Sequence, residues 1–368
     1  MQRVLHVIGK MDRAGAETIL MNIYRNVNRD KLQFDFLVFS EEEGDYDKEI
    51  ESMGGRIYRS VPFKGYNYFE FTRGINKFFR EHPYKIVHGH IGSSAPIYLK
   101  IAKKNGAYAI AHSHATNSNQ WRENLIFQVL SYRVRYIADY FFACSRQAGI
   151  DRFGIKVVKS DQFTVLNNGI DSEKYRYTEE RHTNLKKKFN MDNKLIIGHV
   201  GRFVPVKNHR FVVEVFEKIH EKEKESVLVL AGRGEEEANI KELVAEKGLE
   251  KKVLFLGVRN DIADIMNLFD VFLFPSFYEG LGIVGIEAQA AGLPCFFSEN
   301  IPQEAIMTEN VWRYSLDAGA EKWAKSIVDV VQCYERKDTK KYIEQKKFDI
   351  KGITAELEKF YLKQMSRM

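Results

Sequence analysis

Cysteine is scarce in this sequence, which holds only Cys144, Cys295 and Cys333, all far apart. Three cysteines without CxxC spacing exclude a disulfide framework or a cysteine-based zinc site, and they are typical of a reduced protein. The sequence also lacks any apolar run near the roughly 20 residues that cross a bilayer. It starts on a strand-like segment, without the basic and apolar regions of a signal peptide, so we expect a cytoplasmic protein.

Proline and glycine are also few, with 7 and 25 residues, and no low-complexity or collagen-like stretch is present. The chain is rich in apolar residues, since 44% of its residues are hydrophobic. Its 368 residues exceed one ordinary domain. They fit two domains of roughly 150–200 residues, each with its own core.

Acidic residues are not in excess, because the formal net charge of the chain is +6. Residues 1–170 hold 24 Lys and Arg against 17 Asp and Glu, an excess of +7, and the remainder sums to −1. A basic half suits an anionic partner such as a membrane surface or a lipid phosphate, although ordinary solvated surface charge explains it equally well. Because no recognisable nucleic-acid-binding module is present, we expect no nucleic acid partner.

Short apolar runs alternate with longer amphipathic segments in both halves of the chain. In the first half the runs are Val4–Ile8, Phe34–Phe39, Ile86–His90, Ala109–His112, Tyr140–Ala143 and Phe163–Leu166, with helical stretches such as Ala16–Asn26, Phe69–Arg80 and Asn124–Ala138. In the second half the runs are Leu195–Val200, Val227–Ala231, Val253–Gly257, Val271–Phe274 and Cys295–Phe297, with helices near Asn208–Glu221, Glu236–Glu246 and Gly285–Ala291. Buried strands that alternate with helices predict an α/β fold of two doubly wound, Rossmann-like domains with parallel sheets.

The polar segment Asp171–Lys194 breaks this rhythm, and we interpret it as the linker. The predicted domains are therefore 1–170 and 171–351, and the last helix, within 352–368, is a candidate to pack back on the first domain. Ligands of such folds bind at the carboxyl ends of the strands, so a cleft between the two domains is expected to hold the site.

A glycine-rich turn follows the run Val271–Phe274 and leads into a helix. Gly280 and Gly282 permit a tight turn, and the first amides of the new helix form an anion site. Glu279 in the turn and Glu287, ~7.5 Å into the helix, would then accept hydrogen bonds from sugar hydroxyls. The alternative is that Glu279 caps the helix and Glu287 is a surface residue.

A second loop, after the run Leu195–Val200, places Arg202 and Lys207 five residues apart before a helix. Arginine can fork onto phosphate oxygens and lysine adds a point charge, so together they would neutralise a diphosphate. The alternative is a surface loop with two solvated cations.

Gly201-Arg202…Lys207 followed by Glu279-x7-Glu287 resembles the retaining nucleotide-sugar glycosyltransferases of family 4, which have the two-domain GT-B fold. Nearly the whole chain takes part in the resemblance. Further matching segments are Gly9…Ala14-Gly15-Ala16-Glu17, Val165–Asp171, Val229–Gly234, and Gln289–Pro294, whose ending is similar to that of capsular and exopolysaccharide enzymes.

The resemblance implies roles for the matching residues. Arg202 and Lys207 would hold the donor diphosphate, Glu287 the ribose hydroxyls and Glu279 the transferring sugar. Backbone amides at Gly282 and Ile283 would lie near the phosphates, Val258 near the base, and Gly15 in an acceptor or phosphate loop.

The family often carries a histidine after a buried strand of the first domain, facing the sugar, and the segment Ala111–Asn117 matches it. Its position favours His114 over His112 as a catalytic residue beside Glu279, with Asn117 in the same loop. The alternative is a histidine pair that satisfies loop backbone groups. His88 and His90 are weaker candidates, because the match is poorer there.

No metal or dinucleotide cofactor is expected. The chain has no helix-borne HExxH or cysteine pair to support a metal cluster of its histidines, and no GxGxxG follows the first strand. Asp45-Tyr46-Asp47 is a literal DxD, but it follows an acidic run and is interpreted as a solvated loop. The expected co-substrate is a UDP-sugar.

A stretch from Trp121 and Arg122 through Arg133, Arg135 and Tyr136 to Phe142 mixes aromatic and basic residues. It would either contact anionic lipid at the inner membrane face or pack its aromatic side chains inward.

Taken together, the resemblance implies a retaining, metal-independent transfer of a hexose-type sugar from a nucleotide diphosphate donor. The acceptor would be a saccharide, lipid-linked in the expected case, for a surface polysaccharide. Two alternatives stay open, namely a nucleotide-sugar-modifying enzyme of the epimerase type and a non-catalytic nucleotide-sugar-binding protein.

Overall fold

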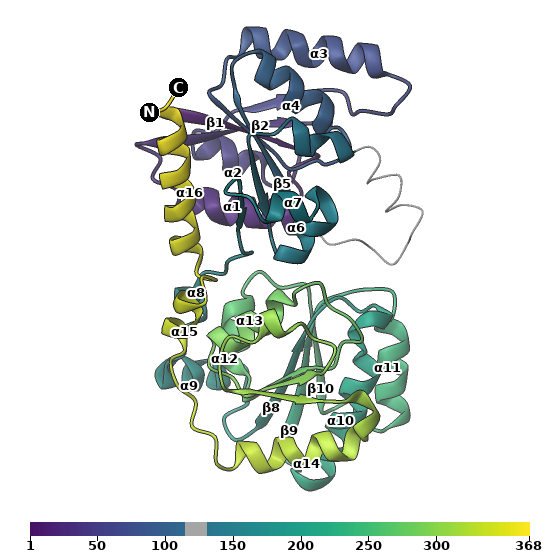
Figure 1. Ribbon diagram of the computed structural model, residues 1–368. Coiled ribbons are helices and arrows are strands. Elements are labelled where there is room, and N and C mark those ends of the chain that lie inside the picture. The colour runs from purple at the N-terminus through teal and green to yellow at the C-terminus, as the bar shows by residue number, and fades with distance from the viewer. Residues whose placement is uncertain (115–130) are drawn as a thin grey trace. The chain divides into compact units, whose positions relative to one another are not determined.

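The computed structural model describes residues 1–114 and 131–368. The chain folds into two compact units (Figure 1). Unit 1 comprises Met1–Gly169 and Ile350–Met368, and unit 2 comprises Ile170–Asp349. Unit 2 is therefore an insertion in the sequence of unit 1.

Unit 1 is built on a seven-stranded parallel sheet. Its strands are β1 (Gln2–Ile8), β2 (Leu32–Val38), β3 (Ile57–Arg59), β4 (Ile86–Gly89), β5 (Tyr108–Ser113), β6 (Tyr140–Ala143) and β7 (Phe163–Val165). They lie in the order β3-β2-β1-β4-β5-β6-β7. The strand order reverses between β1 and β4, and in open parallel sheets such a switch point is where ligands bind.

Helices cover both faces of this sheet. They are α1 (Gly15–Asn26), α2 (Asp47–Ser52), α3 (Tyr68–Glu81), α4 (Ala95–Lys104), η1 (Tyr132–Tyr136), α6 (Arg146–Phe153), α7 (Ile155–Val158) and α16 (Ile350–Met365). Alternate residues of β1 enter different cores, because side chains of a strand point to opposite faces. Val4 and Ile8 pack in one core with α1 and α16, while Leu5 and Val7 pack in the other with α3 and α4.

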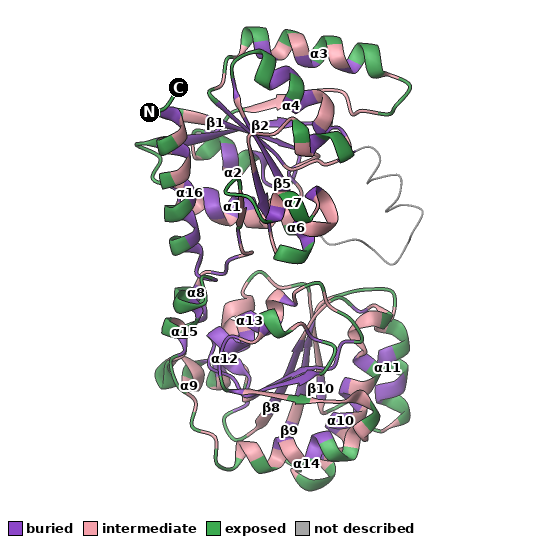
Figure 2. Ribbon diagram, viewed as in Figure 1, coloured by how far each residue is buried: buried purple, intermediate pink, exposed green. Residues whose placement is uncertain are grey.

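Unit 2 repeats the plan with six parallel strands. They are β8 (Leu195–Val200), β9 (Ser226–Ala231), β10 (Val253–Gly257), β11 (Val271–Phe274), β12 (Cys295–Ser298) and β13 (Val311–Tyr314). The order is β10-β9-β8-β11-β12-β13, so the switch point lies between β8 and β11. In Figure 2 the strands of both units are largely buried, and the outward faces of helices such as α3 and α11 are exposed.

The helices of unit 2 again lie on both faces of its sheet. They are α8 (Ser172–Tyr175), α9 (Glu179–Lys188), η2 (Pro205–Lys207), α10 (His209–Lys222), α11 (Glu237–Glu246), α12 (Ile262–Leu268), α13 (Ile283–Ala290), η3 (Gln303–Ala305), η4 (Leu316–Ala318), α14 (Gly319–Val331) and α15 (Lys340–Gln345). Ile265 of α12 and Ile286 of α13 share one core, and Val212 of α10 and Trp323 of α14 share the other. The predicted two-domain α/β fold with parallel sheets is confirmed.

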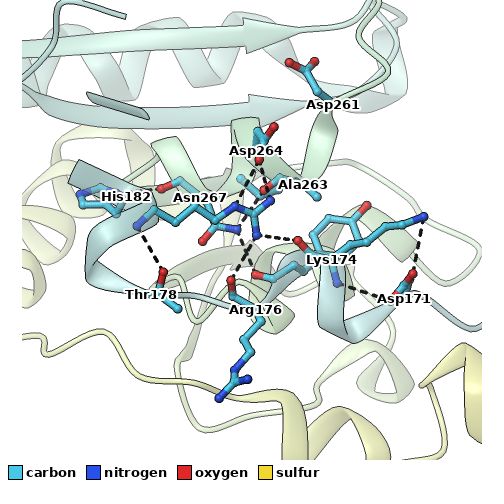
Figure 3. A network of polar contacts seen from close by, with 12 residues as sticks. Asp171, Lys174, Arg176, Thr178, His182, Asp261, Ala263, Asp264 and Asn267 are labelled. Carbon is cyan, nitrogen blue, oxygen red and sulfur yellow. Dashed lines mark hydrogen bonds and ion pairs between the residues drawn. The ribbon is translucent and has the colours of Figure 1, made fainter. Parts of the chain in front are cut away.

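The segment Asp171–Lys194 is not a linker, and that prediction is wrong. It forms α8 and α9, which pack against α12 within unit 2 (Figure 3). Arg181 of α9 donates to the carboxylate of Asp264 at 2.6 Å and to the carbonyl oxygens of Lys174 and Arg176. The charges that suggested a solvated linker are thus largely matched by groups of unit 2.

The last helix, α16, belongs to unit 1. Ile353, Leu357 and Tyr361 are buried in the core that also holds Val4 and Phe34. Among the residues that the structure describes, no helix is long and apolar enough to span a membrane.

Candidate functional site

Two loops meet at the switch point of unit 2. One connects β8 to α10 and carries Lys207, and the other connects β11 to α13 and carries Glu279. Because β8 and β11 are parallel neighbours, their carboxyl ends lie at the same edge of the sheet. The loops are joined directly, since the Phe277 amide donates to the Val206 carbonyl at 2.9 Å.

Lys207 and Glu279 form an ion pair at this edge. The ammonium Nζ of Lys207 lies 2.6 Å from Oε1 of Glu279, and both side chains are largely buried. Lys207 is positioned by the next residue, Asn208, which has a left-handed backbone (φ 56°) and donates to the Pro275 carbonyl. Glu279 therefore pairs with a lysine rather than capping the helix.

The turn before α13 depends on Gly282. Its φ of +79° is left-handed, and an added Cβ would lie 2.9 Å from the Phe274 ring, so a side chain there would be strained. Gly282 caps α13 without a side-chain hydrogen bond. The first amides of a helix have no intrahelical partner, so those of Ile283 and Val284 are available to an anion, whereas the Gly285 amide donates to the Gly282 carbonyl.

Glu287, one turn into α13, is partly buried and is not a free surface residue. The hydroxyl of Tyr175 in α8 donates to its Oε1 at 2.7 Å. Burial raises the pKa of the Glu287 carboxyl to about 7, and the Tyr175 hydrogen bond opposes that rise. The sequence interpretation missed Tyr175, because it lies 112 positions away and belongs to no recognised motif.

Arg202 and Val258 are both exposed. Arg202 follows the end of β8, and Val258 follows β10, two strands away. The loop after β9 packs against the loop after β8, because an added Cβ on Gly232 would lie 1.9 Å from the Gly201 carbonyl oxygen. The guanidinium of Arg202 makes no ion pair within the described ranges, so it is available to a ligand.

In unit 1 the switch point between β1 and β4 carries five histidines. His6 lies on β1, His88 on β4 and His112 on β5, while His90 and His114 directly follow β4 and β5. Side chains two positions apart share a face, and His6 is the register partner of His88. Neighbouring strands therefore place all five rings together, a group we call the histidine cluster.

Three of these rings form a hydrogen-bonded chain. Nδ1 of His6 lies 3.0 Å from Nε2 of His90, and Nδ1 of His90 lies 2.7 Å from Nε2 of His114. Burial lowers the pKa of His6 to about 3 and that of His114 to about 4, so these imidazoles are neutral at pH 7. His88 is held by Tyr361 of α16, whose hydroxyl lies 2.5 Å from its Nδ1.

Among the described residues, no backbone group is bonded to the rings of His112 and His114. The partner of His114 is His90, and both ring nitrogens of the buried His112 lack a hydrogen-bond partner in this part of the chain. Gly15 opens α1 beside the same sheet and is exposed, and an added Cβ there would meet nothing within 4 Å. Asn117, predicted in this loop, lies outside the described residues.

The Asp45-Tyr46-Asp47 segment is only partly a solvated loop, which corrects the sequence interpretation. Asp45 is exposed, but Asp47 begins α2 and is buried. Its Oδ2 accepts hydrogen bonds from the Gly44 amide and from Arg59. Asp47 therefore stabilises the loop that precedes α2.

The aromatic and basic stretch of unit 1 lies partly outside the described residues, including Trp121 and Arg122. Its described part contains the short helix η1, in which Tyr136 is 72% exposed and Tyr132 is 49% exposed. The guanidinium of Arg135 stacks over the Tyr132 ring at 4.2 Å. These two aromatic side chains are exposed, whereas Phe141 and Phe142, at the end of the same stretch, lie on β6 and pack in the cores of unit 1.

Comparisons with known proteins cover both units. Residues 13–174 match Glycosyltransferase Family 4, and residues 180–347 match Glycosyl transferases group 1. EpsF of Bacillus subtilis strain 168, named a glycosyltransferase, is 35% identical over 89% of this chain and 87% of its own. The capsular polysaccharide biosynthesis glycosyltransferase CapH of Staphylococcus aureus is 25% identical over 98% and 99% of the two chains.

A solved structure shares the fold. The crystal structure of Anabaena HepE in complex with UDP superimposes with a TM-score of 0.79, at 18% identity, over 99% of this chain and 100% of that one. The two parallel sheets, the loops at their switch points and the two matched families all lead to the same assignment. This chain belongs to the family 4 glycosyltransferases, with the GT-B fold, and it is a glycosyltransferase.

Proposed function

We propose that this glycosyltransferase moves a hexose-type sugar, with retention of configuration, from a UDP-sugar to a lipid-linked saccharide in surface polysaccharide synthesis. Unit 2 would bind the donor and unit 1 would present the acceptor. The observation that carries the proposal is the Lys207–Glu279 ion pair beside the Gly282 turn at the unit 2 switch point.

This arrangement suits a nucleotide diphosphate. Lys207 and the exposed Arg202 would neutralise the negative charge that grows on the diphosphate as it leaves. The amides of Gly282 and Ile283 would bind its oxygens. Glu279, released from Lys207 by the incoming phosphate, would accept hydroxyl hydrogen bonds from the sugar.

Glu287 would accept hydrogen bonds from the ribose hydroxyls, with Tyr175 orienting its carboxyl. Val258, exposed after β10, would contact the base. The UDP named in the HepE structure supports uridine as that base. In unit 1 the neutral His114 would face the sugar, with His112 and Gly15 nearby.

The proposed acceptor and location rest on the basic charge and exposed aromatic side chains of unit 1, and on the capsular role in the name of CapH. Tyr132 and Tyr136 beside Arg133 and Arg135 would rest on anionic lipid at the cytoplasmic membrane face. Sedimentation with phosphatidylglycerol vesicles, but not with phosphatidylcholine vesicles, tests this contact.

The central experiment is transfer by the Arg202→Ala variant, with Arg210→Ala as a matched control because Arg210 is an exposed arginine of the same unit. Loss of one charge-stabilising donor is expected to lower kcat by about 10²–10³-fold and to weaken UDP binding. Unchanged UDP affinity would overturn the assignment of Arg202.

The product identifies the reaction. An α-linked product from an α-linked donor supports retention, and an inverted product contradicts it. A rearranged nucleotide sugar released without acceptor would indicate an epimerase instead. Turnover is expected to survive EDTA, because the proposed phosphate contacts come from side chains and backbone amides.

A further inference from the structure

Three members of the histidine cluster line a cavity in unit 1. His90, His112 and His114 border a space of about 220 Å³, together with Ser131 and Arg152. One ring nitrogen from each of these histidines lies within 4.8 Å of the others. We call this set the outer histidine triad.

His112 shows that the triad lacks a partner. Its ring is buried, and neither of its nitrogens has a hydrogen-bond partner in the described structure. A buried ring nitrogen without a partner costs folding free energy, so the His112 ring, which lines the cavity and has no partner among the described residues, points to a missing ligand.

The protonation state of the triad suits a cation ligand. Burial, followed by neighbouring imidazoles, lowers the pKa of His90 and of His112 well below the usual value. Neutral imidazole is the form that binds metal ions, so no proton has to leave at neutral pH. Imidazole is a preferred ligand of zinc, copper, nickel and iron.

We propose that the outer histidine triad binds one divalent transition-metal ion of the zinc class. Three histidines with an open fourth position form one of the recognised zinc coordination sets. The cavity provides that open side. Since no carboxylate lines the cavity among the described residues and Arg152 does, the fourth ligand is expected to be water or a small anion.

The distance between two of the three nitrogens requires only a small adjustment, whereas the His112 nitrogen, which lies within 4.8 Å of both, moves closer by up to roughly 1.5 Å. Zinc–nitrogen bonds of about 2.0–2.1 Å in a tetrahedral site place ligand nitrogens roughly 3.3 Å apart. His90 Nδ1 and His114 Nε2 are now 2.7 Å apart and would separate by roughly 0.6 Å. The ion would replace their hydrogen bond and also provide a partner for His112.

A second histidine orients the triad. When Nδ1 of His90 binds the ion, its Nε2–H is directed at Nδ1 of His6, 3.0 Å away. Such outer contacts fix the ligand tautomer and its ring orientation. His6 is therefore a positioning residue.

The other possible triad, His6, His88 and His90, is less suitable. One nitrogen of each also lies within 4.8 Å of the others. However, His88 is already bound to Tyr361, and neither His6 nor His88 borders the cavity. Nε2 of His6 and of His88 are also buried without a partner in the described structure, so the feature that favours the outer histidine triad is the cavity, with its room for a fourth ligand.

The test uses the full chain without a histidine tag, freed of metal by a chelator. Addition of Co²⁺ alone is expected to give the visible absorption bands of a tetrahedral site at a stoichiometry near one. Titration with Zn²⁺ alone by calorimetry is expected to give the same stoichiometry. His112→Asn and His114→Asn should each weaken binding at least tenfold, and His6→Asn by about 10–100-fold.

His220→Asn is the matched control. His220 lies in unit 2 and bonds to Ser226, so its loss should leave binding unchanged. Absence of Co²⁺ or Zn²⁺ binding, or equal binding by the His112→Asn variant and the wild type, would overturn the proposal.

A measurement on the unaltered chain avoids the risk that a buried variant misfolds. Zn²⁺ should shift the imidazole ¹⁵N resonances of His90, His112 and His114 and leave that of His220 in place. Shifts confined to histidines outside the cluster would overturn the proposal. None of these measurements needs a sugar donor, so their failure would be separate from a failure of the proposed transfer.

Discussion

Two opposing effects act on the pKa of the Glu287 carboxyl. This carboxyl is partly buried in α13, which raises its pKa to about 7, while the hydroxyl of Tyr175 favours the ionised form. In the free protein, Glu287 therefore keeps its proton to a higher pH than an exposed glutamate does. A ligand that offers hydroxyl groups would favour its ionised form.

The raised pKa predicts a pH-dependent stability. Between the unfolded value of 4.5 and the folded value of about 7, the native state keeps a proton that the unfolded state has lost. The free energy of unfolding should therefore fall as pH rises through this window, by up to about 3 kcal/mol. Glu287→Gln should remove this fall.

Urea denaturation at pH 5 and pH 8 measures this fall in the free energy of unfolding. The control is Glu250→Gln, at an exposed position of the same unit. Equal pH slopes for Glu287→Gln and the wild type would contradict the burial of this carboxyl.

The sequence predicts Lys207, Glu279 and Glu287 because each belongs to a local motif with a recognisable spacing. It does not predict Tyr175 or His6, because their partners are 112 and 84 positions away and no spacing marks them. The two His-x-His pairs after neighbouring strands were visible. That these histidines form one cluster could be seen only from the strand order, which places β1, β4 and β5 side by side.

Among the elements, α9 is held by several polar side chains, of which Arg181 makes the most contacts. Arg181 donates to the carboxylate of Asp264 in α12 and to the carbonyl oxygens of Lys174 and Arg176, while Lys186 pairs with Asp270. Hydrogen bonds to charged groups contribute about 1.5–3 kcal/mol. We expect Arg181→Met to lower the free energy of unfolding of unit 2 by about 1–3 kcal/mol.

Arg210→Met is the control for that measurement. Arg210 forms an exposed pair with Glu214 one turn along α10, and such pairs contribute about 0.3–0.5 kcal/mol. Equal effects of the two substitutions in urea denaturation would show that α9 does not depend on Arg181.

A second element, α16, is fixed by Tyr361. Its hydroxyl contacts buried His88, so Tyr361→Phe leaves Nδ1 of His88 without a partner at almost unchanged volume. The expected loss is about 1–3 kcal/mol in the unfolding of unit 1. Tyr68→Phe, at a half-exposed position of α3 in the same unit, should change stability by less than about 0.5 kcal/mol. A Tyr361→Phe variant as stable as Tyr68→Phe would contradict this role.

The elements were predicted unevenly for a physical reason. Strands made only of buried apolar residues, such as β11, are evident from the sequence. Edge strands β3 and β13 were missed because they are only partly buried and each contains an exposed arginine. The helices α8 and α9 were taken for a linker because their polar side chains find partners more than 80 positions away.

At the scale of the whole molecule, the two proposals make a joint prediction. If His114 faces the sugar and also binds a transition metal, added Zn²⁺ should lower the initial rate of transfer, and EDTA should restore it. His112→Asn should be less sensitive to Zn²⁺ than the wild type. Loss of turnover in EDTA alone would contradict the metal-independent transfer.

The sequence could not decide which domain takes the last helix. An amphipathic period shows that one face is buried, but not against which partner. The structure divides the chain after Gly169 and again after Asp349, where the sequence pattern had placed the boundaries after 170 and 351.

The position of α16 in the core of unit 1 affects the order of events during translation. Domains usually fold as they leave the ribosome, N-terminal first. Here unit 2 is fully synthesised before α16 exists, so it can fold while the face of β1 and β2 that awaits Ile353, Leu357 and Tyr361 is still uncovered. Unit 1, although it begins the chain, is thus the last unit to be completed.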